Sequence, residues 1–391
     1  MARALPPRGF EAKDTQKRLQ WLEDKTGVRL DGVGVDEPLD FQGIIENHIG
    51  SVNLPLAVAG PLVLDGSYAR GEYYIPLCTL EATLSMSMSR GLYLTSLSGG
   101  IKTRHLKQEI SRSPIFIFND IEDGPEFKRW LQENFELIRE AAESSTNYGK
   151  LLRIDPYLIQ NSVILDFVYS TAEAAGQNMV TIATREACIL IKEEYGRVKK
   201  FQYYIESNFN CDKNPATKTI LLGRGHQVIA STLIEARYLK RVLRADAAHY
   251  VRGWRQCSRG SQMAGVVGMN MHVSNALAAI YLATGQDVAC VSENALGSMD
   301  FEVRNGGDLY ASLTMPSLTV GTVGGGTRLK QQRKNLELLG CTGEDSSKKL
   351  AEIICGAALG LELSLGASIL MNEFAQAHDR YRKNTVLEGQ S

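Results

Sequence analysis

The sequence has few of the features that mark secreted, metal-binding, membrane or nucleic-acid-binding proteins. Its seven cysteines include no Cys-x-x-Cys pair, so we predict neither a disulfide framework nor a metal site. The formal net charge is only -1, which argues against a nucleic-acid partner. No run approaches the roughly 20 apolar residues of a membrane span, and residues 1–10 lack a signal-peptide pattern. We therefore expect reduced thiols and a cytoplasmic protein.

The chain is long enough for more than one hydrophobic core. With 391 residues, of which 44% are hydrophobic, a large domain with a smaller attached or inserted one is expected. Residues 1–45 favour a helical lead-in. Apolar segments and a Ser/Met-rich helix (79–97) follow over 46–113. Residues 114–204 alternate strands with helices, expected over 126–144 and 176–194, in a compact α+β unit. The remainder, 205–391, returns to strands, includes a basic helix over 236–250, and closes with two helices.

Three short stretches could bind a phosphate or carry a reactive group. Gly321–Thr327, of sequence GTVGGGT, follows an apolar strand, and its backbone N–H groups could approach a phosphate or a planar ring. It is not G-x-G-x-x-G, so no Rossmann fold is predicted. Ser170–Met179 leads from a strand into a helix whose N-terminus could accept a phosphate. Gly285–Asp287 follows an apolar helix. Each stretch alone is equally typical of a turn or a helix cap.

Taken together, the motifs resemble those of the 3-hydroxy-3-methylglutaryl-CoA (HMG-CoA) reductase family. They are, in the family's order, ENHIG at 46–50, VAGPL at 58–62, GQNM at 176–179, ATGQD at 283–287, and the segment from MPS at 315 to GGGT at 327. The similarity runs from about Glu46 to His378. It implies an α+β fold in which a large domain around a central helix receives a small, ferredoxin-like α+β cofactor domain. The first motif implies a homodimer or a dimer of dimers with active sites at the interface.

The same resemblance implies four catalytic residues, which are Glu81, Lys213, Asp287 and His378. Lys213 falls in a predicted catalytic loop, 205–216, and His378 in a C-terminal tail, 365–391. Hydride addition to a thioester creates an oxyanion, which a buried ammonium would stabilise. An imidazolium can protonate the departing thiolate. A carboxylic acid can protonate the alkoxide formed by a second hydride, so two NADPH molecules would react in turn.

The resemblance also implies binding residues for the two ligands. The expected cofactor contacts are Glu173, Ala174, Gly176, Gln177, Asn178, Met179, Val323, Gly324, Gly325, Arg382 and Lys383. The last two are basic, which favours NADPH over NADH because a 2′-phosphate binds cations. Glu173 is a departure, since the family has aspartate there. The expected CoA contacts are Ser87, Arg90 and Arg244.

The acyl end of the expected site departs from the family pattern. Arg112 matches the arginine that holds the HMG carboxylate, and Asn275 is a further expected substrate contact. However, Glu206 stands in place of a serine, Asn214 in place of a lysine, and Gln256 in place of another lysine. Each lost charge-assisted hydrogen bond would cost about 1.5 to 3 kcal/mol of binding.

The sequence therefore predicts an NADPH-dependent reductase that converts an acyl-CoA-type thioester through a hemithioacetal and an aldehyde to an alcohol, nominally HMG-CoA to mevalonate. One alternative is a family member acting on a different acyl-CoA or a carrier-bound thioester in specialised metabolism. A second is a non-catalytic homologue serving as a binding or regulatory module. The presence of all four catalytic residues argues against the second alternative.

Overall fold

The computed structural model describes residues 5–30 and 41–371. Within these ranges the chain is an α+β protein, as predicted. The strands are β1 (Leu56–Asp65), β2 (Arg70–Cys78), β3 (Ile101–Arg112), β4 (Ile115–Ile117), β5 (Lys150–Ile159), β6 (Ser162–Ser170), β7 (Gln202–Tyr204), β8 (Gly225–Ile234), β9 (Ser298–Arg304) and β10 (Asp308–Leu318). They form one mixed sheet with the central order β7-β4-β6-β3-β8-β10-β9, in which β1 pairs with β2 and β3, and β5 pairs with β6.

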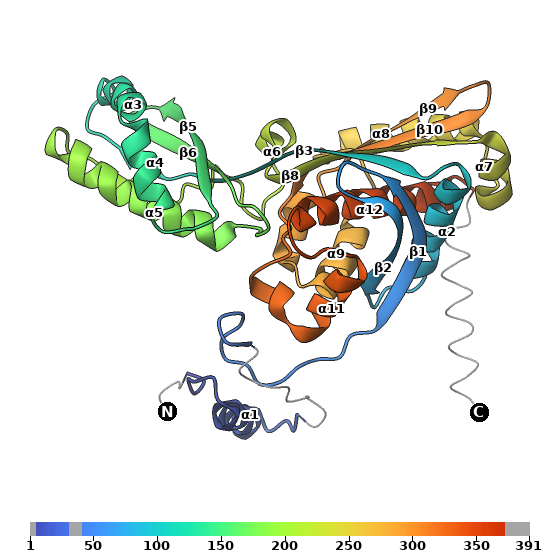
Figure 1. Ribbon diagram of the computed structural model, residues 1–391, viewed down its shortest axis with the longest axis horizontal. Coiled ribbons are helices and arrows are strands. Elements are labelled where there is room, and N and C mark those ends of the chain that lie inside the picture. Colours follow the sequence, from blue (N-terminus) through green and yellow to red (C-terminus); the bar gives the residue numbers. More distant parts are fainter. Residues whose placement is uncertain (1–4, 31–40, 372–391) are drawn as a thin grey trace.

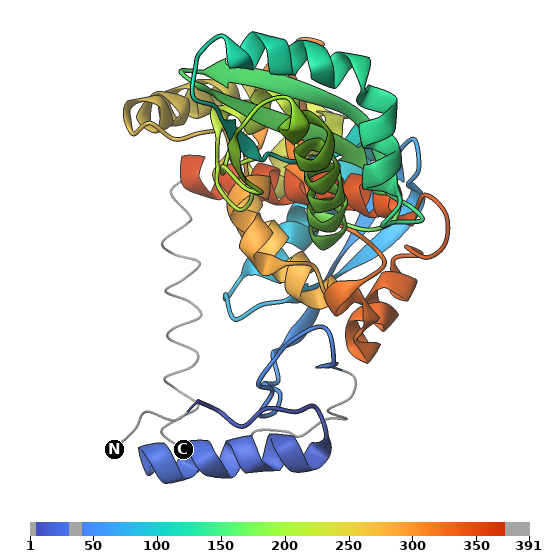
Figure 2. The same cartoon turned by 90° about the vertical axis from the view of Figure 1, so that its left-hand side faces the viewer.

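The helices form two groups, one beside β5 and β6 and the other on the side of β1, β2 and β8, whereas α1 lies apart (Figure 1). They are α1 (Ala12–Thr26), α2 (Leu84–Leu97), α3 (Asp123–Glu133), α4 (Phe135–Glu143), α5 (Gln177–Glu194), α6 (Thr217–Leu222), α7 (Ala236–Leu243), α8 (Ala247–Met263), α9 (Val273–Thr284), α10 (Val291–Asn294), α11 (Lys330–Leu338) and α12 (Ser346–Leu370). In both views α1 lies to one side of the body of the molecule (Figures 1 and 2).

Strand β3 connects a smaller unit to a larger one. Residues 102–109 of β3 pair with β8, whereas its last three residues pair with β6. Two separate hydrophobic clusters lie on either side of this junction, and the smaller contains the rings of Phe116, Phe127 and Tyr195. Figure 1 shows α3, α4, α5, β5 and β6 together on this smaller side. The segment is the one predicted as an inserted cofactor domain at 114–204, and its role as a domain stays a prediction.

Helix α12 lies at the centre of the larger unit, in agreement with the predicted central helix. It is buried on almost every face, which is why its sequence is apolar all round. A side chain at Gly91 of α2 would lie 1.8 Å from the carbonyl oxygen of Gly360, so glycine permits the two helices to touch. Of the described residues, only α12 is long and apolar enough to cross a membrane, and 78% of its most apolar window is buried within the protein.

Three predicted helices have different boundaries in the structure. The helix expected over 79–97 begins at Leu84, because Thr83 adopts a left-handed φ of 73°. The helix expected over 126–144 is divided into α3 and α4 at Asn134, whose φ is -112°. A basic helix expected over 236–250 ends at Leu243, because Arg244 is left-handed with a φ of 55°. Left-handed residues interrupt a right-handed helix, and this conformation is not evident from residue type at Thr83 or Arg244.

Candidate active site

Lys213 and Asp287 form an ion pair. The ammonium Nζ of Lys213 lies 3.0 Å from Oδ2 of Asp287. Asp287 is positioned by the left-handed Gly285 that ends α9 and by the amide of Ala289, which donates to its Oδ1. The hydrogen bond from Lys213 to Asp287 raises the pKa of the ammonium, so the group stays charged. The side chains are 45% and 46% exposed, which corrects the expectation of a buried ammonium within one chain.

The backbone of Lys213 is held by two residues of α10. Its left-handed conformation, with φ of 60°, is unfavourable for a residue with a side chain. The amide of Lys213 donates to Oε2 of Glu293 at 3.2 Å, and the hydroxyl of Ser292 donates to the carbonyl of Lys213 at 2.5 Å. These contacts fix the peptide on both sides and therefore fix the origin of the Lys213 side chain.

Glu293 is itself part of a buried ionic cluster that sequence reasoning missed. Its Oε1 lies 2.6 Å from Nη1 of Arg224, and both side chains are almost fully buried. Burial raises the pKa of Glu293. Arg224 also lies 3.3 Å from Oδ1 of Asp212 and donates to Oε1 of Gln177. The cluster thus joins the Lys213 loop to the beginning of α5.

Arg112 reaches the same loop from the end of β3. Its guanidinium pairs with Glu206 through Nη1 and lies 3.5 Å from Oδ2 of Asp212 through Nη2. Asn214, next to Lys213, turns its amide back to the carbonyl of Asp212 at 2.9 Å. The structure therefore brings Arg112 of β3 against the loop that carries Glu206, Lys213 and Asn214.

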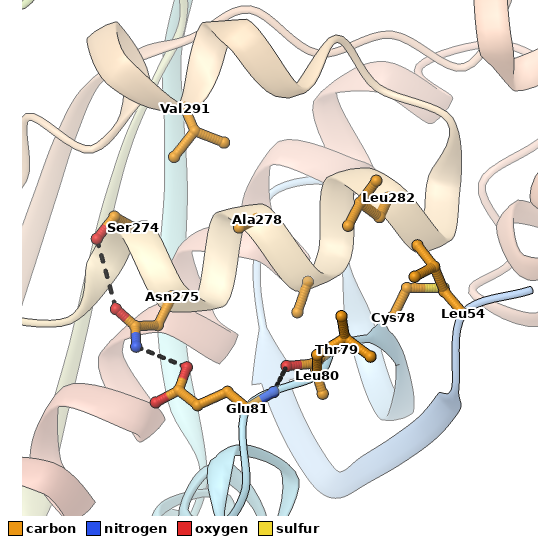
Figure 3. A pocket seen from close by; sticks show the side chains of 11 residues that line it. Leu54, Cys78, Thr79, Leu80, Glu81, Ser274, Asn275, Ala278, Leu282 and Val291 are labelled. Carbon is orange, nitrogen blue, oxygen red and sulfur yellow. Dashed lines mark hydrogen bonds between the residues drawn. The ribbon is translucent and has the colours of Figure 1, made fainter. Parts of the chain in front are cut away.

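Glu81 lies in a different place, beside the first turn of α9. Its Oε2 accepts a hydrogen bond of 2.8 Å from Asn275, and Figure 3 shows the two side chains facing each other. They border a cavity of about 480 Å³, which is lined by Leu54, Cys78, Thr79, Leu80, Glu81, Ser274, Asn275, Ala278, Ala279, Leu282 and Val291. The start of α9 is fixed by Glu362 of α12, which accepts from the amide of Met271 at 3.0 Å. Burial raises the pKa of Glu362 to about 7.

The predicted catalytic groups therefore form two clusters in the described chain. Asn275, the partner of Glu81, lies near the start of α9, whereas Asp287 follows its end. A helix rises 1.5 Å per residue, so Asn275 and Thr284 lie about 14 Å apart along the axis of α9. The cavity extends along α9 as far as Val291, which directly precedes the Ser292 that contacts Lys213.

The two predicted cofactor stretches lie side by side. Ala174 forms a parallel bridge with Val323, and the amide of Thr322 donates to the carbonyl of Glu173 at 2.8 Å. Side chains built at Gly324 and Gly325 would meet no atom within 4 Å, and both residues have positive φ. This loop therefore exposes its backbone at Gly324 and Gly325, and Ala174 connects it to the segment that leads into α5 at Gly176 and Gln177.

Two predicted cofactor residues of this region contact other parts of the chain, and a third is exposed. The Glu173 carboxylate accepts from the amides of Asp345 and Ser347 at 2.8 and 2.7 Å, so it caps α12 and turns away from the glycine loop. The sulfur of Met179 accepts from the Thr146 hydroxyl. Asn178 remains exposed.

The predicted CoA residues lie on two other elements. Ser87 and Arg90 of α2 both contact Ser364 of α12, at 3.0 and 2.9 Å. Arg244 directly follows α7 as its C-cap. Gln256, which was predicted as a contact of the acyl group, lies on α8 and accepts from Arg259. His378, Arg382 and Lys383 lie outside the described residues.

Comparison with solved structures identifies the fold. A class II HMG-CoA reductase of Streptococcus pneumoniae, solved bound to NADPH in open conformations, superposes with a TM-score of 0.69, covering 91% of this chain and 97% of that chain at 18% identity. A second structure of the reductase from the same species gives a TM-score of 0.67. The fold is thus that of these reductases.

Sequence comparison then gives the family. The hydroxymethylglutaryl-coenzyme A reductase family model matches residues 14–383. The HMG-CoA reductase of Methanocaldococcus jannaschii is 37% identical over 374 residues, covering 93% of this chain and 91% of the relative. That of Pyrococcus horikoshii is 39% identical, covering 93% and 90%. The chain belongs to the hydroxymethylglutaryl-coenzyme A reductase family.

Proposed function

We propose that the protein catalyses the NADPH-dependent reduction of HMG-CoA to mevalonate, through a hemithioacetal and an aldehyde. The observation that carries this proposal is the ion pair of Lys213 and Asp287, which lies on the loop joined to the start of α5 by Arg224. Arg224 thereby connects the loop that carries the charged Lys213 to the start of α5, where we propose that the dinucleotide binds. Family membership supports the same reaction.

Lys213 would act on the thioester carbonyl. Hydride addition places negative charge on that oxygen, and a fixed cation stabilises this charge more than it stabilises the neutral carbonyl. Asp287 keeps the ammonium protonated by raising its pKa. Glu81, oriented by Asn275, would provide the proton for the second reduction. His378 is proposed to protonate the departing thiolate.

NADPH would be the second substrate and supply the hydride. The backbone of Gly324 and Gly325 and the N-terminus of α5 are suited to bind it, because free N–H groups and a helix dipole favour phosphate. Arg382 and Lys383 are proposed to bind the 2′-phosphate. Ser87, Arg90 and Arg244 are proposed to meet CoA, although Arg90 already contacts α12 in the described chain.

The direct test is the absorbance of NADPH during incubation with HMG-CoA. We expect about two NADPH oxidised for each free CoA thiol released, because a thioester needs two hydrides to become an alcohol. Mevalonate should be found by mass spectrometry. A ratio of one, with an aldehyde product, would contradict complete reduction, and no oxidation with any acyl-CoA would contradict the reductase proposal itself.

We also propose that the protein is a homodimer, alone or within a dimer of dimers, with active sites shared between subunits. Five large apolar side chains are exposed in the single chain, namely Val52, Leu54, Leu56, Val58 and Leu80. Leu54 and Leu80 line the same cavity as Glu81. Val52 and Leu80 are 82% and 80% exposed. Large exposed apolar side chains such as these are typical of a subunit interface when they gather in one patch. In a dimer, Glu81 of one chain could meet the Lys213 cluster of the other.

A shared site predicts complementation between two inactive variants. Glu81→Ala and Lys213→Ala should each be inactive alone. After the chains are mixed, unfolded and refolded together, about half of the dimers would be mixed and each would contain one intact site, so about a quarter of the wild-type activity is expected. If Glu81 and Lys213 act within one chain, the mixture will stay inactive. Single variants refolded separately and then combined without unfolding are the control.

A second candidate function is the reduction of a different acyl thioester, carried by CoA or by a protein. The ion pair between Arg112 and Glu206 favours it, because that pair occupies the cation expected to bind the HMG carboxylate. The expected cytoplasmic location is a prediction shared by both candidates.

A further inference from the structure

The cations around Lys213 are all paired within the chain. The pairs among the described residues are Arg112–Glu206, Lys213–Asp287, Lys218–Asp166 and Arg224–Glu293. Asp212 contacts both Arg112 and Arg224. Four cations therefore face five carboxylates, and a ligand carboxylate in this region would meet an excess of negative charge.

Glu206 is held firmly in its place beside Arg112. Besides the guanidinium, the amide of Asn208 donates to its Oε1 at 2.7 Å and the side chain of Asn210 donates to its Oε2 at 3.0 Å. Arg112 is only 10% exposed, whereas Glu206 is 34% exposed. The carboxylate thus covers a buried guanidinium from the solvent side, which is the side from which a substrate group would come.

Displacement of Glu206 by a substrate carboxylate would be unfavourable. The incoming group could replace the contact to Arg112, but the two asparagine donors would lose their acceptor, and the displaced carboxylate would remain nearby as a like charge. Asn214 offers no cation, because its amide is bonded to the carbonyl of Asp212. The Glu206 carboxylate therefore binds Arg112 in preference to a carboxylate of the ligand.

We propose that Glu206 is a specificity-determining residue, whose carboxylate occupies Arg112 so that the site prefers thioesters whose acyl group has no free carboxylate. This inference rests on the proposed NADPH-dependent thioester reduction, and it favours the second candidate substrate, an acyl thioester other than HMG-CoA, over the first. The acyl group beside Lys213 is then an uncharged one, with or without a hydroxyl. Because the effect is present before and during hydride transfer alike, it acts on KM rather than on kcat.

Two thioesters that differ only in the relevant group test the proposal. HMG-CoA carries the carboxylate, and 3-hydroxy-3-methylbutyryl-CoA lacks it. We expect wild-type kcat/KM to favour the uncharged thioester by about tenfold or more. In Glu206→Ser and Glu206→Gln, KM for HMG-CoA should fall by about 10- to 100-fold, while KM for the uncharged thioester stays within about twofold. Glu206→Asp, which keeps the charge, should retain the wild-type preference.

The controls separate this inference from the proposed function. Glu143→Gln removes a comparable partner, since Glu143 pairs with Lys150 in the smaller unit and is 21% exposed, and it should change neither KM. Calorimetric Kd values for both thioesters give the same comparison without turnover, and circular dichroism shows whether each variant is folded. A wild-type preference for HMG-CoA that the Glu206 variants weaken, or a preference unchanged in all of them, would overturn the proposal. Failure of the reductase function would instead appear as no NADPH oxidation with either thioester.

Discussion

Replacing Lys213 with alanine is expected to lower kcat for NADPH oxidation by about 10²- to 10³-fold, the usual cost of removing one donor to a developing oxyanion. Lys213 is suited to this role because its pKa is raised by Asp287, so it carries its charge throughout the neutral pH range. Its backbone is fixed by Glu293 and Ser292, so little energy is spent on orientation during the reaction. Single-turnover measurements with saturating thioester would report the effect on hydride transfer.

A matched lysine shows whether the loss is specific. Lys334 forms an exposed ion pair with Glu337 on α11, and Lys334→Ala should keep wild-type activity. Lys213→Arg keeps the charge but changes its geometry, and we expect it to retain more activity than alanine. If Lys213→Ala keeps more than about a tenth of wild-type kcat while folding normally, electrostatic stabilisation by this residue is not the basis of catalysis.

The fold could be predicted from the sequence where a pattern has one physical meaning. The apolar segment that became α12 is surrounded by protein on almost every face, and the implied central helix was confirmed. The start of α5 was predicted at Gly176, and the helix begins at Gln177. Helix ends were wrong where Thr83 and Arg244 adopt left-handed backbones, because tertiary contacts, not residue type, set these conformations.

The candidate site could be predicted as a set of residues but not as an arrangement. Motif order indicated Glu81, Lys213 and Asp287, and the structure pairs the last two. The separation of Glu81 follows from the length and direction of α9, which motif order does not contain. Glu173 was predicted as a cofactor contact, but its carboxylate caps the helix that begins at Ser346, which is far away in the sequence.

Arg224 and Glu293 illustrate what residue patterns leave out. Arg224 stands between Gly223 and Gly225, where side chains would collide with the carbonyl oxygens of Pro316 and Leu318 at 2.7 and 2.3 Å. The glycines therefore let this turn lie directly against β10, and the close approach buries the guanidinium. Its partner is 69 residues away in the chain, so no local spacing connects the two.

Replacing Glu293 with alanine is expected to destabilise the protein by about 3 to 5 kcal/mol, because the charge of Arg224 would remain buried without its main partner. The change also removes the acceptor for the Lys213 amide and for the hydroxyl of Thr319. Urea unfolding followed by circular dichroism would report the loss as a lower midpoint. Glu293→Gln should be affected too, since it keeps only one of the two acceptor oxygens and loses the charge.

The cause can be separated from simple loss of packing by removing both charges. Arg224→Met combined with Glu293→Leu leaves no uncompensated ion, so we expect the double variant to unfold at a higher urea concentration than either single variant. If the two losses instead add, the buried pair stabilises by packing alone. Activity should not recover with stability, because the double variant still lacks the carboxylate that holds Lys213 in its left-handed conformation. Recovered stability with persistent loss of kcat would assign Glu293 a positioning role for Lys213 in addition to its role in the fold.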